Sequence, residues 1–122
     1  MNTAPENPIP PARGLRAGAL LVSCVISLAG ASLVAFAMPA TVSDDRVAAA
    51  WALVQFISGV WAGVLGANSP FLHGLIAGAP ALLLGLAVSS RLPPQYVVVS
   101  WFLAPSAALL AAALMRFMRK RS

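Results

Sequence analysis

The sequence predicts an all-α membrane protein in which four transmembrane helices form an antiparallel bundle. Four stretches of about twenty residues contain no Asp, Glu, Lys or Arg, and about twenty apolar residues in helical form cross the hydrocarbon core of a bilayer. Hydrophobic residues make up 60% of the chain and charged residues 9%, whereas about 25% of the residues are charged in an ordinary soluble domain. We therefore expect a single domain over 15–118, with transmembrane helices at about 17–38, 47–67, 71–90 and 96–115.

The two ends of the chain differ from this apolar centre. Prolines are closely spaced in residues 1–14 and favour an extended segment over a helix, so we expect a flexible proline-rich tail in the cytoplasm. Residues 116–122 form a short basic tail, also expected in the cytoplasm. Arg13 and Arg16 before an apolar run are also typical of a secretory signal peptide. The run is longer than the usual 7–15 or so residues of such a peptide, so we expect it to remain as the first span.

Short polar links separate the predicted helices. Ser43 or Asp44 can cap the second helix, because a side-chain oxygen at that position accepts a free first-turn N–H. Ser69 and Pro70 are typical of the N-cap and the first position of the third helix, and Pro93-Pro94 separates the third helix from the fourth. Links this short force neighbouring helices to run antiparallel, so the chain alternates across the membrane.

The basic residues predict the orientation of the bundle. Six of them lie on the side that holds both termini and two lie on the opposite side. Because positively charged loops stay in the cytoplasm, we expect both termini to be cytoplasmic. Trp51 and Tyr96 then fall near the outer interface, where aromatic rings anchor helices. The larger group consists of Arg13, Arg16, Arg116, Arg119, Lys120 and Arg121, and the smaller of Arg46 and Arg91.

The net charge of +5 does not predict nucleic-acid binding, because basic residues beside membrane spans act as topology signals and attract anionic lipid headgroups. Abundant alanine and a preference for arginine over lysine indicate a GC-rich bacterial genome. We therefore expect a multi-pass protein of the bacterial cytoplasmic (inner) membrane. Its expected partners are membrane lipids and either another membrane protein or further copies of itself.

Small residues at helical spacing predict close packing between the helices. Lipid tails are as apolar as leucine, so membrane helices associate through small residues and a few polar contacts. The second and third spans carry small-xxx-small pairs, and the fourth carries alanines at similar spacing. Packing within the chain is the first interpretation, and a homodimer face is the alternative. The predicted helix-packing glycines are Gly59, Gly63, Gly66, Gly74, Gly78 and Gly85.

Three further positions inside the spans are candidates for a polar contact or a hinge. Gln55 is the most deeply placed strong hydrogen-bonding side chain. We expect it to pair with a serine of the first span or with a carbonyl beside Pro105, and a solute-binding role is the alternative. Pro80 and Pro105 each remove an intrahelical hydrogen bond and tend to bend a helix. Such bends can frame a cavity or be incidental.

No catalytic, metal or cofactor site is predicted. Cys24 is the only cysteine and lies in the first span, where a small apolar packing role fits it. His73 is the only histidine, and one histidine does not build a usual metal site. We expect its ring at the membrane interface, near headgroups or a partner. Asp44 and Asp45 fit a solvated helix cap. Because these groups are expected at different depths, they cannot form a catalytic set, and we expect a non-enzyme.

Two functions are compatible with this pattern. The first is a non-catalytic subunit or scaffold of a membrane complex, favoured by the packing glycines and by the absence of charge inside the spans. The second is a small oligomeric transporter or channel, whose solute must be neutral or hydrophobic because the spans hold no charge. A short chain with few spans and a basic end at 116–121 is similar in architecture to holins, so a holin-like lesion former is a variant of the second function.

Overall fold

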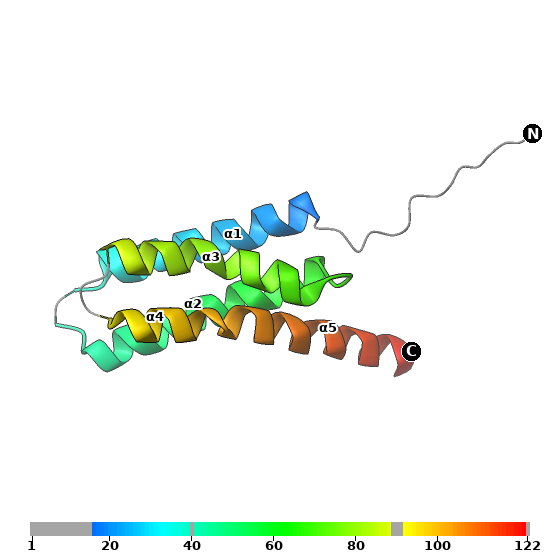
Figure 1. Ribbon diagram of the computed structural model, residues 1–122. Coiled ribbons are helices and arrows are strands. Elements are labelled where there is room, and N and C mark those ends of the chain that lie inside the picture. The colour runs from blue at the N-terminus through cyan, green and yellow to red at the C-terminus, as the bar shows by residue number, and fades with distance from the viewer. Residues whose placement is uncertain (1–15, 40, 89–91, 122) are drawn as a thin grey trace, which may run out of the picture.

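The computed structural model of this chain describes residues 16–39, 41–88 and 92–121. These residues fold into helices, with no strand among them, and Figure 1 shows the helices side by side in one elongated bundle. The prediction of four apolar helices is confirmed. The predicted tail at 1–14, together with Arg13 and Arg91 of the charge comparison, lies outside the described residues. The helical segments long and apolar enough to cross a membrane are Ala17–Ala37, Asp44–Leu65, Pro70–Ala87 and Pro94–Lys120.

The helices pack around a central pair. α2 (Asp44–Leu65) and α3 (Pro70–Val88) contact each other, and each of them contacts α1 (Ala17–Ser32) and α5 (Leu103–Arg121). α4 (Pro94–Trp101) precedes α5 and packs mainly on α3. α1 begins and α5 ends at the same end of the bundle, and successive spans run in opposite directions, with α4 and α5 in line as the fourth (Figure 1).

The helix starts follow the predicted capping chemistry. Ser43 is the N-cap of α2, and its hydroxyl oxygen accepts the N–H of Arg46 at 3.4 Å. Asp44 and Asp45 occupy the first turn of α2, where carboxylates are favoured by the positive end of the helix dipole. α3 begins at Pro70, and α4 likewise begins at a proline, a position where the missing N–H has no helical partner to lose.

The fourth span, for which a bend at Pro105 was predicted, is divided into two helices just before this proline. α4 ends at Trp101, Phe102 forms a turn, and α5 begins at Leu103. Pro105 accounts for the division, because it has no N–H to donate to the carbonyl of Trp101. Just before it, the N–H of Phe102 donates to the carbonyl of Val99, three residues back, at 3.1 Å. This bond is shorter in sequence than the four-residue bond of an α-helix, so the chain forms a tight turn. The fourth span is therefore two helices in line.

The first span has almost its predicted range of 17–38 but ends in another kind of helix, and the last helix is longer than predicted. α1 continues as a π-helix, η1 (Leu33–Ala37), which completes the first span. At the other end of the chain, α5 continues as far as Arg121. The basic residues that were expected in a separate tail therefore extend the last helix, which fixes their positions relative to one another.

Small residues fill the interior of the bundle, and large apolar side chains cover its outside. The fully buried alanines include Ala31, Ala62, Ala77, Ala81, Ala104 and Ala108. Large side chains such as Leu21, Leu53, Phe102 and Leu110 are half or more exposed. Helices that associate in lipid have small residues at their contacts, and the four apolar helices indicate a multi-pass membrane protein.

Trp51, predicted as an aromatic anchor, is buried inside the bundle. Its side chain is 1% exposed and packs in the core beside Val97. The ring fits there because Gly85 has no side chain: a Cβ at this position would lie 2.6 Å from a ring carbon of Trp51. The prediction that Trp51 anchors the bundle among headgroups is therefore wrong. Tyr96 is half-buried, and its hydroxyl donates to the carbonyl of Ala48.

Candidate functional site

The two glycines of the small-xxx-small pair on α2 face the backbone of α5. A Cβ added to Gly59 would overlap the carbonyl oxygen of Ala104, and a Cβ added to Gly63 would overlap that of Ala108. Backbone atoms cannot move aside as a flexible side chain can. α2 and α5 are therefore in direct backbone contact over one full turn, and hydrogen is the only side chain that this spacing admits.

Two glycines of α3, Gly74 and Gly78, also lie against the start of α5. A Cβ on Gly74 would lie 2.5 Å from the Cα of Pro105, and one on Gly78 would lie 2.9 Å from the Cβ of Ala104 and 2.6 Å from the Oε1 of Gln55 on α2. Pro105 itself is fully buried. The start of α5 is therefore inserted between the glycine faces of α2 and α3, and these faces are occupied by the chain itself. They do not remain free for a second copy.

Pro80 lies inside α3 without interrupting the helix, and α1 supplies the hydrogen bonds that this proline disturbs. Pro80 has no N–H for the carbonyl of Ile76, and Cys24 Sγ donates to this carbonyl at 3.6 Å. One residue beyond the proline, the N–H of Ala81 donates to Ser27 Oγ at 3.2 Å. Side chains three residues apart lie on one face of a helix, so one face of α1 serves both groups. Neighbouring helices commonly satisfy such groups in membranes.

Two more donors reach residues 75–81, which we name the Pro80 turn. Gln55 Nε2 of α2 donates to the carbonyl of Gly78 at 3.3 Å, and Trp101 Nε1 of α4 donates to the carbonyl of Leu75 at 2.9 Å. The prediction that Gln55 pairs with a serine of α1 or beside Pro105 is wrong. The Gln55 side chain points to α3, and the serine hydroxyls on the buried face of α1 serve α3 and their own helix.

Two buried polar atoms on α2 have no hydrogen-bond partner in the described part of the chain. They are Gln55 Oε1, an acceptor, and Trp51 Nε1, a donor. These residues are four apart, so they lie on the same helix face one turn from each other. An acceptor and a donor without partners are costly in an apolar interior. Together they offer two complementary hydrogen bonds to a small polar molecule.

His73 joins the first helix to the link between α2 and α3. Its Nε2 accepts the N–H of Arg16 at 2.9 Å, and its Nδ1 lies 2.8 Å from the carbonyl oxygen of Ser69. Because a backbone N–H only donates, Nδ1 carries the ring hydrogen and donates to that carbonyl. The ring is fully buried against Gly66, where a Cβ would overlap it. Of the two predicted surroundings, headgroups or a partner, the buried ring excludes the first, and its two hydrogen-bond partners lie within the chain itself.

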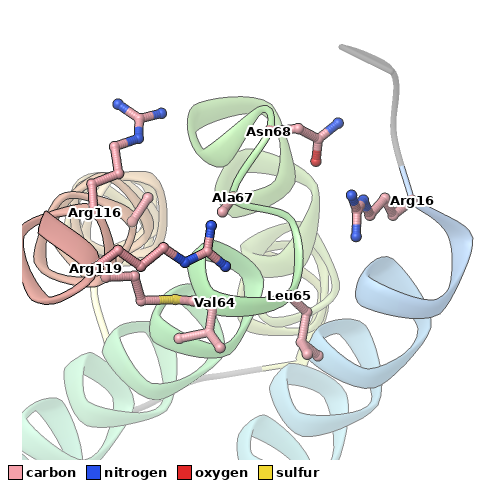
Figure 2. A pocket seen from close by; sticks show the side chains of 9 residues that line it. Arg16, Val64, Leu65, Ala67, Asn68, Arg116 and Arg119 are labelled. Carbon is pink, nitrogen blue, oxygen red and sulfur yellow. The ribbon is translucent and has the colours of Figure 1, made fainter. Parts of the chain in front are cut away.

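A pocket of about 330 Å³ lies at this same end of the bundle. Figure 2 shows Arg16 at the start of α1 on one side of it, and Arg116 and Arg119 of α5 on the other. Asn68 of the α2–α3 link and apolar side chains such as Val64 also line it. We name it the arginine pocket. It is the one place in the described structure where several cations from separate helices meet.

Comparisons of the chain with protein-family models, with curated proteins and with solved structures found no match. Within residues 16–39, 41–88 and 92–121, no three His, Cys, Asp or Glu side chains are grouped so that they could hold a metal ion. The geometry above is therefore the basis for any functional inference.

Sequence reasoning named the glycines, Gln55 and both prolines, but it missed the side chains that serve the Pro80 turn. Cys24 was interpreted as an apolar packing residue, and Trp101 and Ser27 were given no partner in α3. A usable signal exists, because a proline inside a span requires donors and acceptors from neighbouring helices. Cys24 and Ser27 have the spacing to supply both. Which helix faces the proline is a tertiary fact that the sequence alone does not contain.

Proposed function

We propose that this chain is a non-catalytic subunit or scaffold of a membrane complex. One observation carries the proposal: several polar side chains inside the bundle form hydrogen bonds that connect one helix to another. Ser27, Trp101 and His73 each make a hydrogen bond to the backbone of another helix or of a helix link. Groups held in this way build a rigid bundle and are not presented to a substrate.

The proposal includes an orientation and a location. Among the described residues, five basic residues lie at the end that holds both termini, and Arg46 lies at the other end. The positive-inside rule supports placing the termini in the cytoplasm, and the arginine-rich, alanine-rich composition supports a bacterial cytoplasmic membrane. The five basic residues are Arg16, Arg116, Arg119, Lys120 and Arg121.

The partner is proposed to be another membrane protein that contacts the outer helix surfaces. The glycine faces are occupied within the chain, so a partner meets large apolar side chains instead. Leu28 of α1, Phe56 of α2 and Leu110 of α5 are 43–55% exposed. Such side chains contact lipid tails or a partner helix equally well, so the complex depends on shape complementarity.

The test is purification of the tagged full chain from its source membranes in a mild detergent, followed by native mass measurement. We expect a stoichiometric complex with a second membrane protein. Leu28→Ala and Phe56→Ala each remove one exposed apolar side chain, on α1 and on α2. If the partner binds one defined face of the bundle, one of these variants should lose the partner and the other should keep it. A chain that is monomeric in every sample contradicts the proposal.

The second candidate is an oligomeric transporter or channel, holin-like forms included, for a neutral or hydrophobic solute. The free acceptor of Gln55 and the free donor of Trp51 favour it, because a neutral solute could bind to both. Gln55→Leu removes the acceptor, and Phe56→Leu, on the outer surface, is its control. This function is favoured if the unchanged protein and Phe56→Leu make liposomes leak glycerol or calcein and Gln55→Leu does not. Loss of folding with no separate loss of flux would rule out the solute role of Gln55.

A further inference from the structure

We propose that the arginine pocket binds the phosphate group of one anionic phospholipid. Three guanidinium groups line it, from two helices that are distant in sequence: Arg16 on α1, and Arg116 and Arg119 on α5. Figure 2 shows Arg16 on one side of the pocket and the two arginines of α5 on the other. The guanidinium fork matches the oxygens of a phosphate and binds them through paired hydrogen bonds.

The charge distribution along the bundle favours an anion at this end. Arg116 and Arg119 are three residues apart, so they share one face of α5. The two carboxylates among the described residues, Asp44 and Asp45, begin α2 at the opposite end of the bundle. Positive charges gathered at one end of an apolar bundle therefore face the level at which lipid phosphates lie.

The apolar lining of the pocket distinguishes a lipid from free phosphate. Val64 and Leu65 at the end of α2, with Ala112 and Met115 of α5, are apolar residues that line the pocket together with the arginines. A free phosphate ion gains nothing from apolar walls, and a glycerophospholipid places its glycerol and the first carbons of its acyl chains directly below the phosphate. Basic pockets between transmembrane helices bind lipid headgroups for this reason.

The backbone at the edge of the pocket is held in place before any ligand binds. The N–H of Arg16 donates to His73 Nε2 at 2.9 Å, and the other ring nitrogen of His73 donates to the carbonyl of Ser69. This chain of hydrogen bonds ties the start of α1 to the α2–α3 link, from which Asn68 also lines the pocket. His73 is therefore a positioning residue for Arg16.

The test measures lipid retention by the full chain. The protein is purified in detergent, mixed with equal amounts of phosphatidylglycerol and phosphatidylcholine of the same acyl length, and examined by native mass spectrometry. We expect one phosphatidylglycerol per chain to be retained in preference to phosphatidylcholine. Arg16→Gln and Arg116→Gln are each expected to weaken this retention about fivefold, the effect of one arginine near a phosphate.

Two matched variants separate the pocket from general charge attraction. Lys120→Gln removes a cation of α5 that does not line the pocket, and Arg46→Gln removes one at the opposite end. Both should retain phosphatidylglycerol as the unchanged protein does. Equal loss in all four variants, or no loss in any, overturns the proposal. Thermal unfolding of each variant establishes that it is folded.

A second arm distinguishes the two sources of phosphate. Millimolar inorganic phosphate is added to the lipid-loaded protein, and we expect it to leave the bound phosphatidylglycerol in place. If inorganic phosphate displaces all of the bound phosphatidylglycerol, and the lipid mixture shows no preference for phosphatidylglycerol over phosphatidylcholine, the pocket is a site for free phosphate and the lipid assignment is wrong.

The positioning role of His73 has its own test. His73→Leu should weaken phosphatidylglycerol retention because the N–H of Arg16 loses its acceptor. His73→Gln, whose amide oxygen can accept the same N–H, should restore it. If both variants weaken phosphatidylglycerol retention to the same extent, His73 does not position Arg16. The assignment of the pocket to a lipid does not depend on this result.

Discussion

The chain has two prolines inside predicted spans, in similar local sequences, and the bundle accommodates them in different ways. Ala79-Pro80-Ala81 lies within a continuous helix, α3, whereas Ala104-Pro105-Ser106 lies in the first turn of α5, just after a break. The first turn of a helix has N–H groups without intrahelical partners. The missing N–H of Pro105 therefore costs little there, while that of Pro80 must be compensated from outside the helix.

The difference comes from the neighbours and not from the prolines. Beside Pro105, Gly59 and Gly74 bring the backbones of α2 and α3 so close that no side chain fits between. Beside Pro80, α1 brings Cys24 and Ser27, whose side chains reach the disturbed backbone groups. The bundle thus tolerates a proline in two ways. Either a new helix begins at the proline, or side chains of a neighbouring helix form hydrogen bonds with the backbone groups that the proline leaves unpaired, and the two sites differ in which helix packs against them.

The largest effect is expected from filling the close contact beside Pro105. In Gly59→Val, the new Cβ overlaps the backbone of Ala104, which cannot give way, so α5 must separate from α2. We expect the free energy of unfolding to fall by about 3 kcal/mol or more, measured by reversible unfolding in mixed micelles. Gly18→Val is the matched control, because a Cβ there meets nothing. Equal stability of the two variants would contradict the backbone contact between α2 and α5.

A smaller effect tests the borrowed hydrogen bonds at Pro80. Ser27→Ala leaves the N–H of Ala81 without its acceptor, and we expect a loss of about 1 kcal/mol. In a Pro80→Ala background this loss should nearly vanish, because the helix can then close its own hydrogen bonds. In a Pro105→Ala background it should remain. A double-mutant cycle on unfolding free energies measures this coupling, and additivity of Ser27→Ala with Pro80→Ala would contradict it.

The same comparison explains how much of the fold the sequence could predict. Length and lack of charge were enough for four helices, and Ser43 and Pro70 were enough for two of the helix starts, because these signals are local. The π-helical end of the first span was not predicted, and neither was the form of the change before Pro105, a break at Phe102 where a bend was predicted. Both depend on which neighbouring helix packs against the segment. The helical spacing of residues in the sequence does not show which helices are neighbours.

The candidate site was predictable to a lesser degree. The glycines could be named because small residues at four-residue spacing have few other uses in a span. The buried positions of Trp51 and His73 could not be predicted, because each ring occupies a space left by a glycine on another segment, Gly85 or Gly66. The arginine pocket requires the start of α1 to meet the end of α5, a contact between residues about 100 positions apart in the sequence.

The smallest expected effect concerns the sulfur of Cys24. Its thiol is a weak donor, so Cys24→Ala should lower the free energy of unfolding by only about 0.5 kcal/mol. Cys24→Ser keeps a donor, and a stronger one, at the same place, so it should retain the contact with the carbonyl of Ile76. An isotope label on that carbonyl gives a direct measurement: its infrared amide I band should move to higher frequency in Cys24→Ala and stay low in Cys24→Ser. If both variants shift the band equally, the sulfur acts only by filling space, and the carbonyl freed by Pro80 is not served by α1.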